Sequence, residues 1–412
     1  MSEPKTNEQT ASSDVPAHVP ASLVRRFDFY DGPGMRKDPF ASVAKLHDGP
    51  PIFWTDYSVR YGHGSWIVTR AQDIRHVLET PDLFTSAGWS QNQAITGAKW
   101  PLVPIELDGA QHQSFRSLIM PWLTGPTMLR RKDGIRERAA SLIAQFASSG
   151  RCDFVQAFGR VFPVSIFLDL FGLPREEMGV LLGWEQNLLH NTDRPTRIDA
   201  AREIIAYLER TAENRRANPR DDLISLVVHA QIDGITITQD ETTGLLFTLF
   251  LAGLDTVAAS LSFHFHHLAV EPTLQEQLRE TPSRIPAAVE EFLRAFSPVN
   301  ARRRAVRDTE ITGVKIKAGD WITIPYALGS LDPNEFPNPH KVDIERNSRR
   351  HFAFAAGPHA CAGAQLARIE LVIAIEEWLK AIPTFKLQPG EQLRVHGGGV
   401  YGIDYLPLVW SI

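Results

Sequence analysis

The sequence predicts a mainly helical (α+β) single domain with small β-sheets, and three observations support this fold class. Residues 126–230 alternate amphipathic helical segments with short loops, as at 134–147, 163–171 and 198–214. Residues 238–265 form a longer segment that is apolar around its circumference, which is typical of a helix inside a large protein. No Pro/Gly/Ser-rich linker divides the 412 residues. We therefore expect one domain, 18–412, behind a polar, disordered tail, 1–17.

Composition narrows the classes of partner and compartment. The net charge of −5 argues against nucleic acid as the main partner. Two cysteines far apart in the sequence indicate a reducing compartment and no disulfide framework. The N-terminal residues lack the apolar core of a signal peptide, and the most hydrophobic later window, 245–254, is too short to span a membrane. We expect a cytoplasmic monomer that does not bind a membrane.

The first third of the chain combines a small β-rich part with an irregular loop. Residues 51–70 contain two β-rich runs around a glycine-containing turn, which predicts a hairpin, and 71–80 reads as a short helix. Residues 84–104 have no clean period and carry bulky apolar side chains. Such a loop is often a lid or a binding loop. Aromatic side chains that anchor the loop to the core are the alternative.

A helix with two basic residues on one face is expected next. Asp108 is typical of a helix N-cap, and His112 and Arg116 lie four residues apart on the helix that follows. Two donors on one face suit a carboxylate or a phosphate. A solvated surface remains the alternative.

The apolar segment contains an anomaly at Ala252-Gly-Leu-Asp255-Thr256. Thr238 and Glu241 have the spacing of a capping box that opens the helix. A mid-helix glycine, a buried acid and a threonine that can bond back to the carbonyl four residues earlier predict a local opening beside a flat ligand. Asp255 and Thr256 would move protons there; a kinked helix with a surface aspartate is the alternative. His264, His266 and His267 near the end of the helix are expected to be solvated.

A shorter helix, 286–296, begins at a proline and carries Glu291 and Arg294, which lie three apart and can pair. Near the C-terminus, Gly397-Gly-Gly-Val-Tyr-Gly402 fits a dinucleotide-binding pattern, but it does not open a helix after a strand. We interpret it as a hairpin turn. The chain therefore shows no nicotinamide or flavin site of its own.

Cys361 lies in Phe354-Ala-Ala-Gly357-Pro-His359-Ala-Cys361-Ala-Gly363, directly before a strongly helical stretch, 363–379. A helix start favours the thiolate form of a cysteine. A catalytic nucleophile would need an oriented base, and a zinc or iron–sulfur site would need more cysteines than Cys152 can add. A single thiolate on haem iron needs one cysteine and small, flat surroundings. A buried cysteine with only a structural role remains the alternative.

These motifs together resemble the cytochrome P-450 monooxygenases. Residues 354, 357, 361 and 363 look like that family's haem-binding signature, and 252–256 is similar to its oxygen-activating motif. The resemblance implies haem b between the long central helix and the Cys-loop helix, with Cys361 as the axial ligand of the iron. It also implies that Thr256 holds the oxygen's hydrogen-bond network and that Asp255 relays protons.

The resemblance assigns further residues by position. The haem-binding residues, including the contacts of the propionates, would be Cys361, Phe354, Gly357, Gly363, His359, Arg303, His112 and Arg116. Because Arg302 and Arg304 flank Arg303, the position of the arginine that contacts the propionate is uncertain by one residue. Glu291, Arg294 and Arg346 match a structural motif.

Segments 284–294, 252–257 and 406–410 are most similar to the soluble bacterial branch that includes the camphor hydroxylase. Trp100 stands where that enzyme has a tyrosine that binds its substrate, and Pro101 stands where an acidic residue helps to hold a propionate, so camphor itself is in doubt. The expected pocket residues are Trp100, Leu102, Thr248, Leu251, Val299 and Val400, which suit a compact, mostly apolar, terpenoid-like substrate.

Since no reductase domain is evident, the branch implies O2 as oxidant and electrons from a [2Fe–2S] ferredoxin with an NAD(P)H-dependent ferredoxin reductase. The expected docking surface lies around Arg70, Arg75 and Arg116. Two alternatives remain. A peroxygenase would use H2O2 directly, and a haem sensor or carrier would not be an enzyme.

Overall fold

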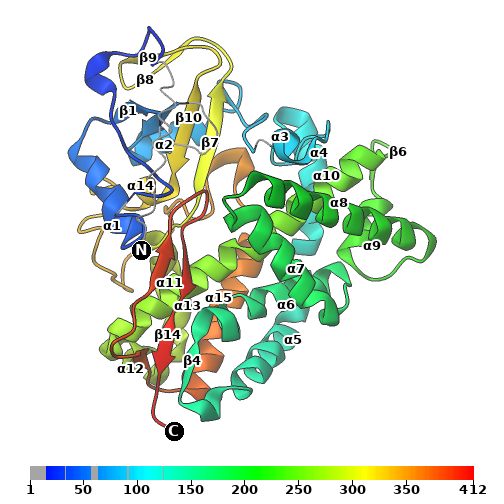
Figure 1. The fold of residues 1–412 in the computed structure, drawn as a ribbon, viewed down its shortest axis with the longest axis vertical. Helices are drawn as coiled ribbons and strands as arrows, with labels where there is room; N and C mark the ends of the chain where they lie inside the picture. Colours follow the sequence, from blue (N-terminus) through cyan, green and yellow to red (C-terminus); the bar gives the residue numbers. More distant parts are fainter. Residues whose placement is uncertain (1–14, 33, 57–63, 91, 124) are drawn as a thin grey trace, which may run out of the picture.

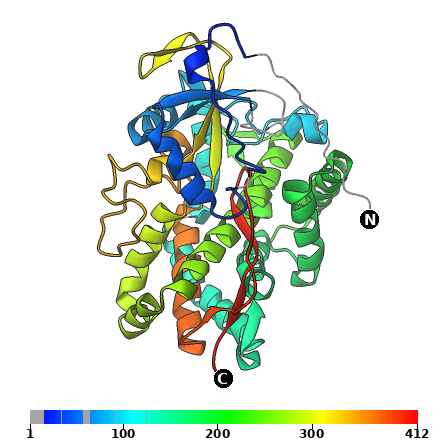
Figure 2. The same cartoon turned by 60° about the vertical axis from the view of Figure 1, so that its left-hand side comes forward.

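The structure, a computed structural model, describes residues 15–412 apart from 33, 57–63, 91 and 124. The tail predicted for 1–17 therefore lies outside the described residues except at its end. The main β-rich part occupies one end of the molecule, and helices dominate the rest, with short strands among them (Figures 1 and 2). The predicted fold class, mainly helical with small sheets, is confirmed.

Helices dominate the chain from residue 109 onward. The α-helices are α1 (Pro39–Ala44), α2 (Ala71–Glu79), α3 (Asn92–Thr96), α4 (Gly109–Leu123), α5 (Gly125–Ala144), α6 (Val161–Phe171), α7 (Met178–Glu185), α8 (Arg194–Ala217), α9 (Leu223–Val228), α10 (Gln239–Leu254), α11 (Thr256–Val270), α12 (Pro272–Glu280), α13 (Ile285–Ala295), α14 (Tyr326–Ser330) and α15 (Ala364–Ala381).

The main sheet is mixed and has the strand order β1-β2-β10-β7-β3. The predicted hairpin forms its edge, where β1 and β2 pair antiparallel with Trp54 opposite Trp66. The strands are β1 (Ile52–Thr55), β2 (Ser65–Val68), β3 (Phe84–Thr85), β4 (Arg151–Asp153), β5 (Gln231–Ile232), β6 (Ile235–Thr236), β7 (Asn300–Ala305), β8 (Thr309–Ile311), β9 (Val314–Ile316), β10 (Trp321–Pro325), β11 (Lys386–Leu387), β12 (Arg394–His396), β13 (Gly402–Tyr405) and β14 (Pro407–Val409). The glycine-rich segment 397–402 is a hairpin connection between the antiparallel strands β12 and β13, as predicted.

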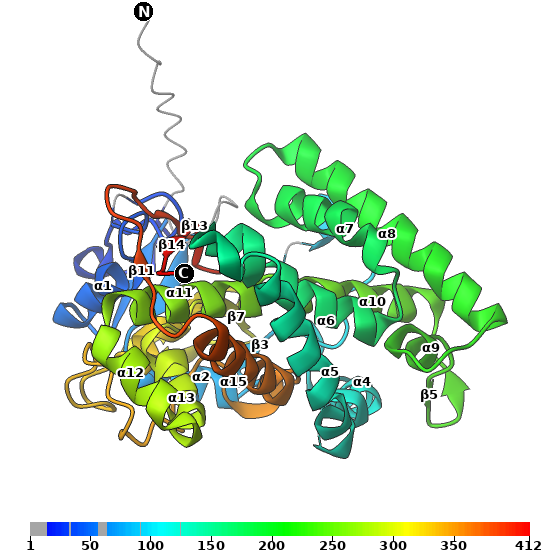
Figure 3. The same cartoon turned by 90° about the horizontal axis from the view of Figure 1, so that it is seen from below.

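Helices α10 and α11 lie end to end through the middle of the molecule, with α7 and α8 on one side and α5 and α15 on the other (Figure 3). The segment Gln239–Val270 is long and apolar enough to cross a membrane by length and composition. However, 61% of its most apolar window is buried inside the fold. It is the core helix of this domain, because its apolar circumference is covered by other helices.

The predicted opening of this helix is confirmed. The capping box starts α10, since the Thr238 hydroxyl accepts from the backbone N–H of Glu241 and the Glu241 carboxylate accepts from that of Thr238. The helix is interrupted at Asp255, and the Thr256 hydroxyl donates to the carbonyl of Ala252 at 3.2 Å. The sequence predicts that Gly253 helps to open the helix, but the structure gives another reason for a glycine at this position. A Cβ there would lie 2.8 Å from the ring of Phe167, so the glycine allows α6 to pack closely against α10.

The expectation that the histidines of α11 are solvated is wrong for His264. Its side chain is fully buried and packs against Phe292, with ring centroids 5.2 Å apart. Neither ring nitrogen has a hydrogen-bond partner among the described residues. Burial lowers the pKa of His264 from 6.5 to about 3, so the imidazole is neutral in the folded protein.

This histidine predicts acid sensitivity. Because the folded pKa lies below the unfolded one, the unfolded chain binds the proton first. The stability is complete above pH 6.5 and falls as the pH drops toward 3, by about 2 kcal/mol at pH 5. We expect His264→Leu to flatten the pH dependence of the free energy of unfolding between pH 8 and pH 5, measured by urea titration. The exposed His340→Gln is the control, and an unchanged slope in His264→Leu would contradict the assignment.

Candidate active site

Cys361 is positioned by a tight loop before α15. Its backbone N–H donates to the carbonyl of Phe354 at 2.9 Å, and α15 begins three residues later. Gly357 has a φ of +69°, and a Cβ there would lie 2.6 Å from the carbonyl of Leu78. Only glycine fits this turn, because it both adopts the left-handed conformation and lets the loop approach α2. Gly363 is less constrained, since an added Cβ would make an ordinary contact of 3.9 Å with the Cys361 sulfur.

The thiol does not have the low pKa that a helix start alone predicts. The Cys361 side chain is accessible, yet it lies so deep in the fold that burial raises the pKa of the thiol. The backbone N–H of Gly363 and the charges of Arg116 and Arg368 act in the opposite direction but do not prevail. A thiolate here needs a stronger cationic partner, and a bound metal ion deprotonates a thiol outright. Cys152, in contrast, is half-buried in β4, and burial raises its pKa to about 12.

The side chains expected at the haem propionates gather beside the thiol. The rings of His112 and His359 lie 4.1 Å apart between centroids. Burial, reinforced by His359 and Arg116, lowers the pKa of His112 to about 4, and Arg303 acts in the same direction. Burial also lowers the pKa of Arg116, while the charge of Cys361 raises it. The four basic residues therefore sense one another across a shared space near the thiol.

Asp108 directly precedes α4 as predicted, and its backbone carbonyl accepts from the N–H of His112, but its side chain has other partners. Its carboxylate accepts from the backbone N–H of Ser86 at 3.1 Å and from the Thr85 hydroxyl, and it contacts His359 Nε2 at 2.9 Å. The hydrogen bond from His359 is the main reason that the pKa of Asp108 is lowered although burial would raise it. The carboxylate joins β3 to the cysteine loop instead of capping α4. It therefore fixes the ring of His359 beside His112.

Strand geometry decides among the three arginines of β7. Arg302 and Arg304 lie over the ring of Trp321, at 4.5 and 5.5 Å from its centroid. Because side chains alternate along a strand, Arg303 points to the other face. There it is buried, and its charge acts on His112. This orientation favours Arg303 over its two neighbours as the arginine that joins His112, His359 and Arg116. We call these four residues the basic cluster.

The residues present fit a haem. The accessible thiol is flanked by Ala360, Ala362 and Gly363, which leave room for a flat group. The basic cluster beside it offers N–H donors from α4, β7 and the cysteine loop, and carboxylates such as propionates suit such donors. A thiol whose pKa is raised by burial suits coordination to a metal, where the bond to the metal replaces the lost solvation.

A cavity of about 620 Å³ lies along α10 and α11. Its lining includes Asp255 and Thr256, the expected catalytic pair, together with the expected substrate residues Leu102, Thr248, Leu251, Val299 and Val400. Val299 and Val400 are brought together by an isolated β-bridge. Trp100, the remaining expected pocket residue, is not part of the lining. It is buried against Phe247, with ring centroids 5.7 Å apart, so the expectation that it contacts substrate is corrected.

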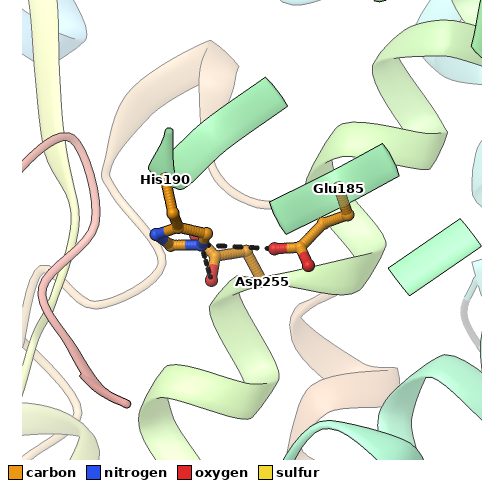
Figure 4. A group of neighbouring side chains, drawn as sticks. All are labelled: Glu185, His190 and Asp255. Atoms are coloured by element: carbon orange, nitrogen blue, oxygen red, sulfur yellow. Dashed lines mark hydrogen bonds and ion pairs between the residues drawn. The ribbon is translucent and has the colours of Figure 1, made fainter. Parts of the chain in front are cut away.

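Asp255 has partners that sequence reasoning missed. His190 Nε2 lies 3.3 Å from Asp255 Oδ1 and 3.3 Å from Glu185 Oε1. Figure 4 shows the imidazole facing both carboxylates. Glu185 also forms an ion pair with Arg160. These residues lie far from Asp255 in the sequence and form no motif, so no sequence signal connected them.

The expected structural group comes together behind the cysteine loop. Arg294 Nη2 lies 2.8 Å from Glu291 Oε1, and Arg346 Nε lies 3.2 Å from the same oxygen. Glu291 and Arg294 have no exposed side-chain surface. The ion pair of Glu291 and Arg294 is therefore buried, whereas the three-residue spacing alone would also allow an exposed pair on the helix surface.

The three arginines expected to dock an electron donor have different surroundings. Arg70 donates to the carbonyls of His47 and Gly49, at 3.0 and 2.9 Å, and so holds the turn before β1. Arg116 belongs to the basic cluster. Arg75 lies over the ring of Phe352, next to the cysteine loop, at 4.7 Å from its centroid.

Comparisons with known proteins agree with this arrangement. The family model described as Cytochrome P450 matches residues 181–395. The chain is 40% identical to a probable cytochrome P450 127A1 of Sinorhizobium fredii, over 98% of this chain and 99% of that protein. It is 30% identical to the mycinamicin IV hydroxylase/epoxidase of Micromonospora griseorubida, over 85% and 90% of the two chains. The crystal structure of cytochrome P450 CYP101C1 superposes with a TM-score of 0.87 at 33% identity, covering 97% of this chain and all of that one.

Proposed function

Because this chain belongs to the cytochrome P450 family, whose members bind haem b and act as monooxygenases, we propose that it hydroxylates an apolar substrate held in the cavity beside Asp255 and Thr256. The single observation that carries the proposal is the placement of this acid–alcohol pair at the helix opening, on the wall of the cavity. A family resemblance alone would not place a proton donor where the substrate binds.

In this proposal Cys361 is the axial ligand of the haem iron. Arg116, Arg303, His112 and His359 would hold the propionates, and Asp108 would keep the ring of His359 in place. When bound, the haem supplies the activation of O2 for insertion of one oxygen atom into a C–H bond, and the thiolate favours O–O cleavage. The chain's own part is to bind the substrate, exclude bulk water and deliver protons through Thr256 and Asp255.

The substrate that we propose is terpenoid-like, and the cavity has room for a skeleton as large as or larger than a ten-carbon monoterpenoid. A cavity of about 150 Å³ accommodates a benzene molecule, whereas this cavity is about 620 Å³. Cavities of about 300–1,000 Å³ hold drug-sized ligands. The apolar wall formed by Leu102, Leu251, Val299 and Val400 supports a mostly hydrocarbon skeleton. Trp100 does not line the cavity, so it offers no counterpart of the tyrosine that binds camphor in the resembled branch.

The electrons are proposed to come from a [2Fe–2S] ferredoxin and its NAD(P)H-dependent reductase, as the similarity to the camphor-hydroxylase branch implies. Support for docking on the cysteine side is limited to Arg75 and Arg116, because Arg70 is engaged in a turn. The acid–alcohol pair favours this O2-dependent route over the peroxygenase alternative, because H2O2 already carries the two protons that the O2 route takes from solvent.

The test of the function has two stages. The haem-loaded protein, reduced under CO, should show a strongly red-shifted Soret band, which reports a thiolate ligand. Camphor, limonene and larger polycyclic terpenoids are then added to the ferric protein, and a shift to high spin identifies the ligands of the cavity. Hydroxylated product with a surrogate ferredoxin system establishes the enzyme. A CO band typical of a histidine ligand, or ligand binding without any product, would overturn the proposal.

Thr256 provides a sharper prediction within the same assay. Thr256→Ala removes the hydroxyl at the helix opening, so we expect product per NADH to fall by at least ~10-fold, with H2O2 released instead. Thr256→Ser keeps a hydroxyl and is the matched variant, expected to retain most of the coupling. Equal product per NADH in the wild type and Thr256→Ala would favour the peroxygenase alternative.

A further inference from the structure

We propose that His190 stores a proton for Asp255 and supplies it to that carboxylate in each cycle. His396 and Asp404 connect His190 to the protein surface. The inference rests on the proposed function, because it concerns the protons that the site consumes. It adds residues from the π-helical turn after α7, from β12 and from β13 that the acid–alcohol motif does not include.

The geometry around His190 is that of a shared proton. The residue ends the π-helical turn Gln186–His190, which follows α7. Its Nε2 is 3.3 Å from a carboxylate oxygen of Asp255 and equally far from one of Glu185 (Figure 4). One N–H therefore faces two acceptors at equal distance, so the proton on Nε2 can pass to the Asp255 carboxylate without a change of partner.

Electrostatics keep this relay loaded at rest. Burial acts to lower the pKa of His190, but Asp255 and Glu185 outweigh it and raise the pKa to about 10. Burial likewise acts to raise the pKa of Asp255, but His190 outweighs it and the pKa is lowered, with help from His396 and Arg160. At neutral pH the proton therefore resides on His190, and Asp255 is a carboxylate.

Separation of the pair reverses the preference. Without its partner, a buried imidazole favours the neutral form and a buried carboxyl group favours the protonated form. One proton passes from Nε2 of His190 to Asp255 as the two groups begin to part, which leaves a neutral imidazole and a carboxylic acid. The acid is next to Thr256 in the chain and lines the same cavity. His190 afterwards regains one proton from the surface, so the charge balances over the cycle.

A route to the surface is present on the cavity wall. The rings of His190 and His396 lie 4.9 Å apart between centroids, and His396 Nδ1 is 3.0 Å from Asp404 Oδ1. The side chain of Asp404 is 48% exposed. His190, His396 and Asp404 all line the cavity of about 620 Å³, whose volume has room for water molecules beside the two rings.

The charged groups around His190 come from every element packed against it. They are Glu185 from α7, Asp255 from the break between α10 and α11, Arg160 before α6, Arg197 from α8, Arg394 and His396 from β12, and Asp404 from β13. The trio Glu185, His190 and Asp255 also has the spacing of a metal site. The Arg160 guanidinium, however, is bound to Glu185, and a protonated His190 has no free lone pair at Nε2. Because the positive charges of Arg160 and protonated His190 oppose a bound metal ion, we interpret the trio as part of a proton relay.

The first test is independent of turnover. In the reduced, CO-bound holoenzyme, the imidazole of His190 is titrated by NMR of 15N-histidine-labelled protein. We expect it to stay protonated to about pH 10 and, in Asp255→Asn, to lose its proton several pH units lower. If His190 titrates near 6.5 in both proteins, it does not hold a proton for Asp255 and the proposal is wrong.

The second test separates a relay from a mere charge partner. His190→Gln removes the titrating group, whereas His190→Arg keeps a positive charge that cannot release its proton. With a surrogate ferredoxin system and limonene as probe, we expect both variants to form product at least ~10-fold more slowly at pH 8, with a larger solvent isotope effect and a smaller deficit at pH 6. Wild-type rates in His190→Arg would show that only the charge matters, which overturns the relay.

Controls separate this inference from the proposed function. His396→Gln should reproduce part of the loss, and the exposed His340→Gln should not. The CO spectrum should be unchanged in all variants, since these residues touch neither the thiol nor the basic cluster. If the wild type forms no product, the proposed function fails and the NMR titration still decides on His190. If the wild type and His190→Gln turn over equally, only the relay fails.

Discussion

Cys361→Ser is expected to abolish the red-shifted CO band and to lower product formation below detection while the fold survives. The loop is held by the backbone N–H of residue 361, which donates to Phe354, and by the glycine turn at Gly357, and serine preserves both. The oxygen of serine is a harder and weaker electron donor than a thiolate, so the push toward O–O cleavage is lost. Absorption spectra and product analysis measure the effect, and thermal unfolding checks the fold.

The matched control is the second cysteine. Cys152 lies half-buried in β4, away from the basic cluster, and burial raises its pKa to about 12. Cys152→Ser should therefore keep the CO band and the activity of the wild type. A red-shifted band that persists in Cys361→Ser and disappears in Cys152→Ser would show that Cys152 is the thiolate ligand, which would contradict the assignment to Cys361.

Glu291→Ala is expected to be the most destabilising single replacement in the chain's polar interior. Glu291 accepts from Arg294, Arg346, Ser348 and the backbone of Asp343. Its removal leaves the fully buried guanidinium of Arg294 without its carboxylate. Loss of one partner of a buried pair costs about 3–5 kcal/mol. Urea unfolding should show this loss of free energy, and haem should dissociate more readily because the segment 341–348 leads into the cysteine loop.

An exposed pair serves as the control. Glu276 and Arg279 have the same three-residue spacing on α12, but their side chains are 63% and 38% exposed and their charges lie 3.9 Å apart. Glu276→Ala should change the free energy of unfolding by no more than about 0.5 kcal/mol. A loss of under 1 kcal/mol in Glu291→Ala would show that the buried group is not a structural anchor. The double variant Glu291→Leu/Arg294→Met, which removes both charges, should recover part of the stability.

Sequence by itself determined the features that depend on local chemistry. The helical periodicity predicted the fold class, and the capping box and the glycine–acid–alcohol segment predicted where α10 begins and where it opens, because caps and back-bonded threonines act within one turn of chain. The hairpin reading of 397–402 held for the same reason, since the glycines and the short strands β12 and β13 are neighbours. The signature around Cys361 carried the family resemblance that the comparisons then confirmed.

Tertiary structure alone decided the features that depend on distant contacts. The pairing of Asp255 with His190 and Glu185 joins segments that no local rule relates, and only packing across α7 and the helix opening brings them together. Trp100 turned from an expected substrate contact into a core residue, because Phe247 lies against it. Asp108 and His264 likewise changed role, since a side chain's partners and burial are set by whichever element packs over it, and a sequence position does not specify that element.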